Sequence, residues 1–181
     1  MKIAIGCDHV ATKTKDEMVQ ILKSWGHTVI DCGTYNDIRT HYPIYGFEVA
    51  RQVALKKAQF GVVICGTGVG ITNSANKTYA ARCILTKDVA CAVAARKLYD
   101  ANIVGMGARI SGIGLISEIV KAFLSTKYEG KNKADIKKID SVLKKKNLDT
   151  KQFNQLIKKW ENGEYTDKVK QSKILLPKTF K

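Results

Sequence analysis

The sequence predicts an α/β protein: a three-layer α/β/α sandwich around a five-stranded parallel, Rossmann-like sheet, with a helical C-terminal extension. Short apolar segments alternate with helix-like segments five times along residues 2–125. The apolar segments are continuous rather than alternating, which is typical of strands buried on both faces of a sheet. Beyond Gly130 the composition changes and lysine becomes frequent. We therefore divide the chain into an α/β domain, residues 1–130, and a lysine-rich helical extension, residues 131–181, which we expect to form a subunit interface.

The individual elements follow from local patterns. The expected strands are residues 2–7, 27–31, 60–65, 82–85 and 102–106. The expected helices are residues 12–25, 43–58, 69–76, 88–98 and 112–125, with 132–146 and 150–161 in the extension. Thr12 or Thr14 is available to cap the first helix, Gly26 ends it, and Pro43 suits the first turn of the second. Residues 32–42 read as a polar loop, and residues 168–181 show no clear pattern.

The charge of the chain raises the question of nucleic-acid binding. The formal net charge is +15, and residues 127–181 hold 16 Lys against 7 Asp and Glu. No nucleic-acid-binding motif accompanies these lysines, which are spread around the predicted helices. A solvated lysine face is therefore the better interpretation, and we expect no nucleic-acid partner.

The start of the chain and its apolar runs predict a location. Met1–Ile5 reads as the beginning of a strand rather than as a signal peptide. No apolar run approaches the roughly 20 residues that a membrane helix needs. We expect a cytoplasmic protein without a membrane partner.

Cysteine and histidine usage argues against a metal or a cofactor. The five cysteines include no C-x-x-C pair, and the three histidines have no paired spacing, so we expect reduced thiols and no metal. The first strand is followed by Cys-Asp-His instead of G-x-G-x-x-G, which excludes a nicotinamide fingerprint there. No Gly-Lys-Ser/Thr follows the later glycine turn, which excludes a P-loop. We expect no cofactor.

Three stretches should meet at one edge of the sheet. They are Cys7-Asp8-His9, the turn 65-CGTGVG-70, and the turn after the fifth strand that bears Arg109. Each follows a predicted parallel strand, and such sheets bind ligands at the carboxyl ends of their strands. Arg39 and His41, in the loop after the second strand, are further candidates for this edge.

The glycine turn has two interpretations. Converging backbone N–H groups and a helix N-terminus would bind an oxyanion and favour the thiolate form of Cys65, which could then act as a nucleophile or proton acceptor. Equally, the turn could be a tight strand-to-helix connection beside a buried structural cysteine. The residues alone leave both interpretations open.

Several spaced motifs together resemble one family. They are 6-GCDH-9, 65-CGTGVG-70, 102-NIVGMGAR-109 and 128-YEG-130. In order and spacing they resemble the ribose-5-phosphate isomerase B / galactose-6-phosphate isomerase family over roughly residues 1–145. The resemblance implies a metal-free aldose–ketose isomerase that acts on sugar phosphates.

The resemblance also implies roles for the residues at the edge. Cys65 would be the base that moves a proton between C1 and C2. Thr67 and the backbone N–H groups of residues 66–70, including Gly66, Gly68 and Gly70, would stabilise the enediolate. Asp8 and His9 would bind the sugar and its phosphate, and Arg109 matches another ligand-binding position. Arg39 and Tyr42, which follow the second strand, are further candidate substrate-binding residues.

The chain departs from the family at positions that matter. Ribose-type members carry a His-Asn pair where this chain has Leu98 and Tyr99, and two phosphate-binding arginines where it has Asn132 and Ile136. In this family the active site lies between two subunits. The resemblance therefore implies a heteromeric galactose-6-phosphate isomerase, in which a companion A-type subunit supplies the missing histidine and arginines. The stretches 30-IDCGTY-35, 39-RTHYPIYG-46 and 159-KWENGEY-165 resemble the two-component enzymes in particular.

The resulting expectation is conversion of a phosphorylated hexose, galactose 6-phosphate, to tagatose 6-phosphate in lactose and galactose breakdown. Two alternatives remain. One is a self-sufficient isomerase of ribose 5-phosphate or allose 6-phosphate. The other is a non-catalytic sugar-phosphate-binding or scaffold protein.

Overall fold

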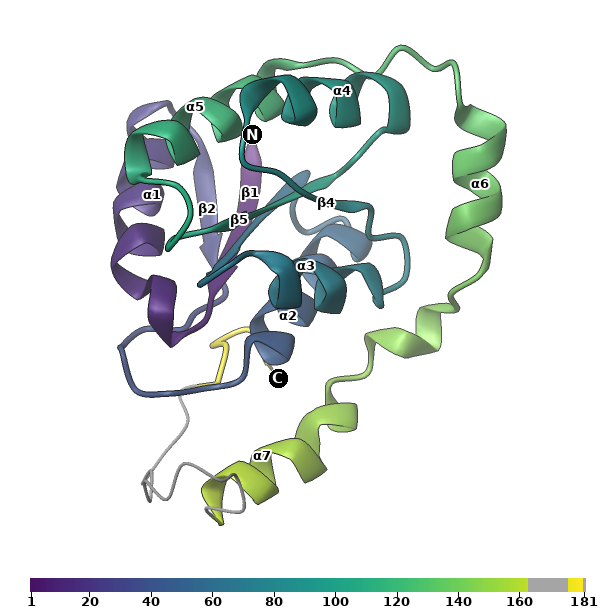
Figure 1. Ribbon diagram of the computed structural model, residues 1–181. Helices are drawn as coiled ribbons and strands as arrows, with labels where there is room; N and C mark the ends of the chain where they lie inside the picture. Colours follow the sequence, from purple (N-terminus) through teal and green to yellow (C-terminus); the bar gives the residue numbers. More distant parts are fainter. Residues whose placement is uncertain (163–175, 181) are drawn as a thin grey trace.

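The computed structural model describes residues 1–162 and 176–180 (Figure 1). Its centre is one sheet of five parallel strands in the order β2-β1-β3-β5-β4. The strands are β1 (Lys2–Cys7), β2 (Thr28–Asp31), β3 (Phe60–Cys65), β4 (Cys83–Leu85) and β5 (Ile103–Gly107). The helices are α1 (Thr12–Ser24), α2 (Tyr42–Ala54), α3 (Val69–Asn76), α4 (Val89–Tyr99), α5 (Ile113–Ser125), α6 (Lys133–Ser141) and α7 (Asn154–Glu161). The predicted three-layer sandwich with a parallel sheet is confirmed.

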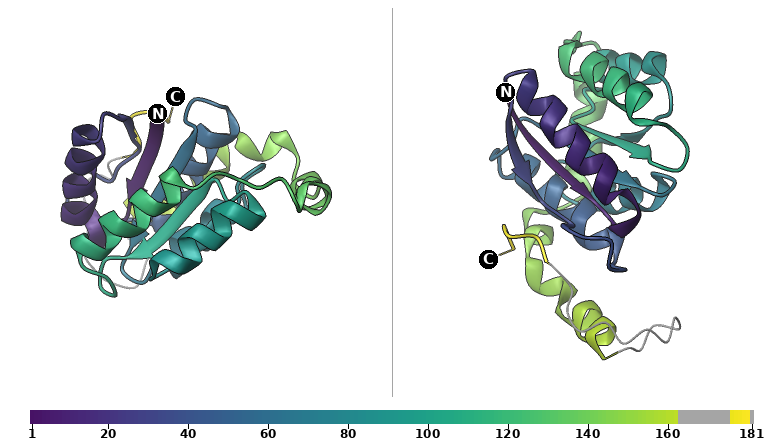
Figure 2. Two further views of the ribbon diagram at one scale, coloured as in Figure 1. Left: turned by 90° about the horizontal axis from the view of Figure 1, so that it is seen from above. Right: turned by 90° about the vertical axis from the view of Figure 1, so that its left-hand side faces the viewer.

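Helices cover both faces of the sheet (Figure 2). Ile3 and Ile5 of β1 point into a core shared with α1, α4 and α5, whereas Ala4, between them, points into a second core shared with α2 and α3. A strand with a buried core on each side has no position for a polar side chain, which explains the continuous apolar runs.

Several predicted boundaries were wrong. The second helix ends at Ala54 instead of residue 58, because the chain turns at Lys56, whose φ is 57°. In the extension, the helix predicted for 132–146 ends at Ser141 and is followed by a 3-10 turn, Lys145–Leu148. The helix predicted for 150–161 begins with another 3-10 turn, Thr150–Phe153.

The predicted threonine cap of the first helix was also wrong. Ala11 is the N-cap of α1 and makes no side-chain hydrogen bond. A 3-10 turn, His9–Ala11, precedes the helix, and Asp8 caps that turn. The hydroxyl of Thr12 instead donates to the backbone carbonyl of Asn36, at 2.7 Å, and thereby ties the 32–41 loop to the start of α1.

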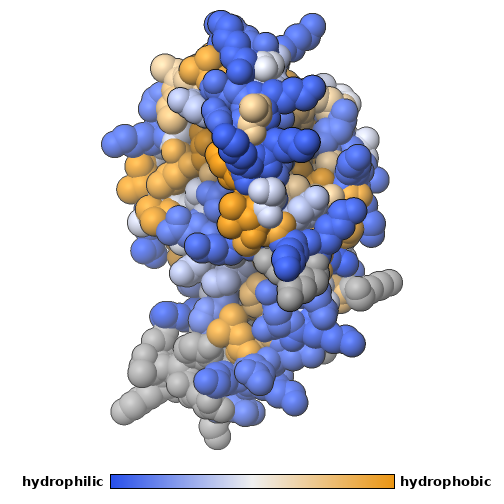
Figure 3. Space-filling view, turned by 90° about the vertical axis from the view of Figure 1, so that its right-hand side faces the viewer, coloured by the Kyte–Doolittle hydropathy of each residue, from blue (hydrophilic) through white to orange (hydrophobic). Residues whose placement is uncertain are grey.

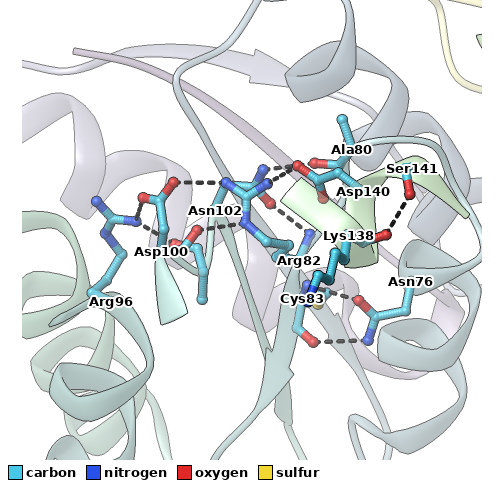
Figure 4. A network of polar contacts seen from close by, with 11 residues as sticks. Asn76, Ala80, Arg82, Cys83, Arg96, Asp100, Asn102, Lys138, Asp140 and Ser141 are labelled. Atoms are coloured by element: carbon cyan, nitrogen blue, oxygen red, sulfur yellow. Dashed lines mark hydrogen bonds and ion pairs between the residues drawn. The ribbon is translucent and has the colours of Figure 1, made fainter. Parts of the chain in front are cut away.

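An ion-pair network fastens α6 to the domain (Figure 4). Arg82, just before β4, donates to Asp140 of α6 at 2.7 Å and to Asp100 at 2.8 Å. Asp100 also accepts from Arg96 of α4 at 2.7 Å. The extension is thus anchored at the end of the sheet where β4 and β5 begin.

The outer side of the extension carries exposed apolar residues. Ile139 is 62% exposed and Val142, the residue after α6, is 77% exposed. In the face shown in Figure 3, apolar patches lie among many hydrophilic side chains. Of the residues predicted to lack a pattern, 168–181, only 176–180 belong to the described part; they return to pack beside α2 (Figure 1).

Candidate functional site

Strand order brings the predicted stretches together. β1, β3 and β5 are neighbours, and Cys65 pairs with Gly107 at the carboxyl end of the sheet. The backbone N–H of Asp8 donates to the carbonyl of Ile64 at 3.3 Å, and that of Arg109 donates to Gly66 at 3.0 Å. The three loops that follow these strands are therefore bonded to one another, as predicted.

The Cys65 thiol sits inside the glycine turn. Its side chain is 5% exposed, and the N–H of Gly68 donates to its Sγ at 3.1 Å. The N–H of Val69, the first residue of α3, donates to the hydroxyl of Thr67 at 3.3 Å. The turn thus directs the backbone N–H groups of Gly68 and Val69 at the side chains of Cys65 and Thr67.

Gly68 makes this arrangement possible. Its φ is +81°, in the left-handed region. A Cβ at this position would lie 2.6 Å from the Leu85 side chain and 2.7 Å from the carbonyl carbon of Met106. Only glycine lets the turn approach β5 so closely and aim its N–H at sulfur.

Three other cysteines have a different environment. Burial raises the pKa of Cys7 and of Cys83 to about 12, and raises the pKa of Cys32 well above its ordinary value. These thiols stay protonated and are part of the core. The fifth, Cys91, is exposed on α4. All five cysteines are free in the structure.

Asp8 and His9 lie at the end of β1. Asp8 is 8% exposed, and its carboxylate accepts from the N–H of Val10 at 3.1 Å. Burial raises the pKa of Asp8, although the charges of His9 and Arg109 oppose this shift. Nδ1 of His9 accepts from the N–H of Thr40 at 3.3 Å. A neutral His9 therefore carries its proton on Nε2, where it can donate to a ligand.

Arg109 and Tyr42 border the glycine turn from two sides. A Cβ on Gly66 would lie 3.6 Å from Cδ of Arg109, so the arginine stem covers the start of the turn. A Cβ on Gly70 would lie 2.7 Å from the ring of Tyr42, so that ring covers its end. Tyr42 is 40% exposed.

Arg39 lies in the loop that precedes α2. Burial lowers the pKa of His41, and the nearby charge of Arg39 lowers it further. Arg39 and His41 are thus neighbours. Thr40 between them was missed from the sequence, because it acts on His9 through its backbone and its residue type carries no signal of that role.

Two cavities adjoin the turn. One of about 240 Å³ is lined by Thr67, Leu85, Thr86, Lys87, Gly107 and Ile110. Another of about 360 Å³ is bordered by Tyr42 and Gly70 and also by residues of the extension, Gln152 and Phe153. Thr86 and Lys87 were not among the predicted site residues, since they follow a short strand without a motif.

The departures from the family pattern lie at the opposite edge of the sheet. Leu98 and Tyr99 end α4, just before β5 begins at Ile103. The side chain of Asn132 donates to the carbonyl of Leu98 at 2.9 Å, and Ile136 is 8% exposed. A five-residue strand spans about 17 Å, so these residues cannot reach the Cys65 turn of the same chain.

Among residues 1–162 and 176–180, no group of three or more His, Cys, Asp or Glu side chains is placed to hold a metal ion. No helix within the same residues has the length and apolar character needed to cross a membrane.

The fold and this edge define an open parallel α/β protein with a cysteine-containing glycine turn at the carboxyl ends of its strands. Residues 3–142 match the model of the Ribose/Galactose Isomerase family. The chain belongs to this family, as its motifs predicted.

Individual relatives agree. The chain is 46% identical over 170 residues to "Galactose-6-phosphate isomerase subunit LacB" of Clostridium acetobutylicum, covering 91% of this chain and 98% of that protein. It is 43% identical over 129 residues to "Ribose-5-phosphate isomerase B" of Escherichia coli, covering 71% of this chain and 87% of that protein. The solved structure of ribose-5-phosphate isomerase B from Clostridium thermocellum superposes with a TM-score of 0.76 at 36% identity, covering 78% and 97% of the two chains.

Proposed function

We propose that this chain is a subunit of a metal-free galactose-6-phosphate isomerase, which converts galactose 6-phosphate to tagatose 6-phosphate in lactose and galactose breakdown in the cytoplasm. The observation that supports an isomerase is the Cys65 thiol, held by the N–H of Gly68 beside Asp8, His9 and Arg109. The preference for galactose rests on the match to the Clostridium acetobutylicum subunit. That match covers 91% of the chain, so it continues beyond residue 142, where the family model ends.

We assign to Cys65 the transfer of one proton from C2 to C1 of the substrate. Its thiolate removes the proton from C2 of the open-chain aldose, and the electron pair moves to give an enediolate. The N–H groups of residues 66–70 and the hydroxyl of Thr67 stabilise the negative oxygen. The thiol then returns the proton to C1 while the hydroxyl proton of O2 passes to O1, which forms the C2 carbonyl of the ketose and regenerates the thiolate without net oxidation.

The remaining residues bind the substrate. Nε2–H of His9 and the guanidinium groups of Arg109 and Arg39 bind substrate oxygens, the phosphate included. Asp8 accepts a hydrogen bond from a sugar hydroxyl. Tyr42, which covers the end of the turn, borders the bound sugar.

A companion A-type subunit supplies what this chain lacks. Leu98 and Ile136 have no side-chain donor, and each hydrogen bond to a charged group is worth about 1.5–3 kcal/mol. Loss of two arginines therefore costs about 3–6 kcal/mol, or roughly 10²–10⁴ in phosphate affinity. A site built only from copies of this chain would bind the substrate poorly.

We further propose that residues 131–181 take part in the subunit interface. Ile139, Val142 and Tyr99, which is 58% exposed, lie at the edge of the sheet that carries the departures from the family pattern. A partner subunit that packs on this edge would cover these apolar side chains.

An assay of the chain alone and in mixture tests the proposal. The purified chain and the A-type subunit are assayed on galactose 6-phosphate separately and together. We expect turnover in the mixture only, and its loss with Cys65→Ala but not with Cys91→Ala, which removes an exposed thiol elsewhere. Full activity of the Cys65→Ala complex would refute the role of the thiol.

The second candidate is a self-sufficient ribose-5-phosphate isomerase. The 43% identity to the Escherichia coli enzyme favours it. Efficient turnover of ribose 5-phosphate by the chain alone would establish this alternative, and would mean that other side chains replace the missing histidine and arginines.

A further inference from the structure

Residues 176–180, which we call the strap, pack beside α2 (yellow in Figure 1). The ring centroid of Phe180 lies 6.2 Å from that of Phe47 and 6.1 Å from that of Phe153. Leu176 and Phe180 join the core cluster between α2 and the sheet. The strap is therefore attached by apolar contacts over its length.

The strap also completes a buried charge site. Glu48 of α2 is fully buried, and its carboxylate accepts from the hydroxyl of Thr179 at 2.5 Å. The other donors are Arg51, at 3.1 Å, and Gln52, at 2.5 Å. A buried carboxylate needs such donors. Thr179 therefore contacts α2 through the buried carboxylate of Glu48 and not through a group on the surface.

A second polar contact joins the strap to the loop after β2. The N–H of Lys178 donates to Oη of Tyr35 at 3.3 Å, and its ammonium lies 4.9 Å from the centre of the Tyr35 ring. The ammonium of Lys15 lies 5.1 Å from the same ring. Oη of Tyr35 in turn donates to the carbonyl of Asp31 at 3.1 Å. Tyr35 is thus held from both the strap and α1.

The loop that carries Tyr35 reaches the candidate site. Thr40 of this loop donates its N–H to His9 and bonds the hydroxyl of Tyr45 at 3.0 Å. Arg39 is its neighbour. A displacement of the loop would move Arg39 and release Nδ1 of His9 at the same time.

We propose that Lys178, Thr179 and Phe180 are positioning residues, which hold Tyr35 and α2 so that the 32–41 loop places Arg39 at the substrate and keeps Thr40 bonded to Nδ1 of His9. This inference rests on the proposed function for its kinetic effect only. The strap touches no reacting atom, so it should act on substrate binding and leave the proton transfer at Cys65 unchanged.

Hydrogen exchange of the chain alone tests the mechanical part. In the double variant Thr179→Val/Phe180→Ala we expect the amides of residues 33–41 to exchange about tenfold faster or more, as the loss of a hydrogen bond to a charged group allows. Thr179→Val alone is the milder variant and should act in the same direction. Leu156→Ala is the control, because Leu156 packs on the same cluster but belongs to α7. It should lower thermal stability without changing exchange in the loop.

Steady-state kinetics of the mixed complex test the functional part. We expect the double variant to raise KM for galactose 6-phosphate about tenfold and to change kcat less than about twofold. In an Arg39→Ala background the double variant should raise KM little further, because both changes act through the 32–41 loop.

The outcomes separate the two proposals. Unchanged exchange at residues 33–41 overturns the strap, whatever the activity. Fully additive effects of the strap variant and Arg39→Ala overturn its action through Arg39. Absence of any turnover in the wild-type mixture refutes the proposed function, while the exchange experiment still decides the strap.

Discussion

Substitution of Gly68 by alanine tests how the site is built. Gly68 has a φ of +81° and donates its N–H to Sγ of Cys65 at 3.1 Å. Alanine in this conformation costs roughly 1–2 kcal/mol. The added Cβ would also lie 2.6 Å from the end of the Leu85 side chain and 2.7 Å from the backbone carbon of Met106.

The two close contacts differ in their cost. Leu85 is 42% exposed and can move aside, whereas Met106 belongs to a buried strand that is paired on both sides. Relief of the second contact must move the turn itself, at roughly 1–3 kcal/mol for overpacking. Gly68→Ala should therefore lower the free energy of unfolding by about 2–5 kcal/mol. Displacement of one preorganised N–H should lower kcat by about 10²–10³ in the mixed complex.

Gly114→Ala provides the matched control. Gly114 lies in α5, and a Cβ there meets nothing within 4 Å. We expect this variant to keep its activity and to gain up to about 1 kcal/mol, because alanine favours a helix. Urea denaturation and the coupled isomerase assay measure both variants. If Gly68→Ala stays within about 0.5 kcal/mol of wild type and keeps its kcat, the close packing of the turn on β5 is refuted.

Three further predictions concern charge and reactivity. Asp8→Asn keeps an oxygen that can accept from the N–H of Val10 but removes the ionisable group. Burial raises the pKa of Asp8, so the native state keeps this proton to a higher pH than the unfolded state does. The free energy of unfolding of the wild type therefore falls as pH rises from the unfolded-state pKa to the folded-state pKa. Thermal melts should show the variant gaining on wild type as pH rises through that interval. Arg82→Gln leaves the carboxylate of Asp100 with fewer donors and should cost about 1–3 kcal/mol in denaturant unfolding. Iodoacetamide should modify the exposed Cys91 first and the buried Cys65 next, ahead of Cys7, Cys32 and Cys83, whose pKa values burial raises; substrate should slow Cys65 alone, as read by peptide mass spectrometry.

Each of these has a result that contradicts it. For Asp8, the contradiction is a stability difference that stays constant with pH. For Arg82, it is unfolding unchanged within error, with Lys87→Gln as the control for loss of one positive charge. For the thiols, it is modification of Cys7 or Cys83 at the rate of Cys65.

The patterns that predicted the sheet are local. The spacing of apolar residues along a short stretch distinguishes a buried strand from a helix. The five strands and the five helices of the domain were therefore predicted within a few residues. The extension was predicted less well, because α6 and α7 are short and their lysine-rich faces define no sharp ends. The cap of the first helix failed because Thr12 bonds Asn36, a partner 24 residues away.

The sequence alone also determined which residues meet at the edge. Parallel strands end on one side, so residues that directly follow β1, β3 and β5 had to come together, and Asp8, Cys65 and Arg109 do. The roles of these residues in catalysis stay proposals, supported by family membership.

Contacts between distant segments were decided by the tertiary structure only. The close approach of Gly68 to Met106, the tautomer that Thr40 imposes on His9, and the bond from Lys178 to Tyr35 all depend on where the chain returns in space. None of them changes the local pattern of apolar and polar residues. A sequence specifies its elements through such patterns, whereas the distances that orient a functional group arise when the elements pack.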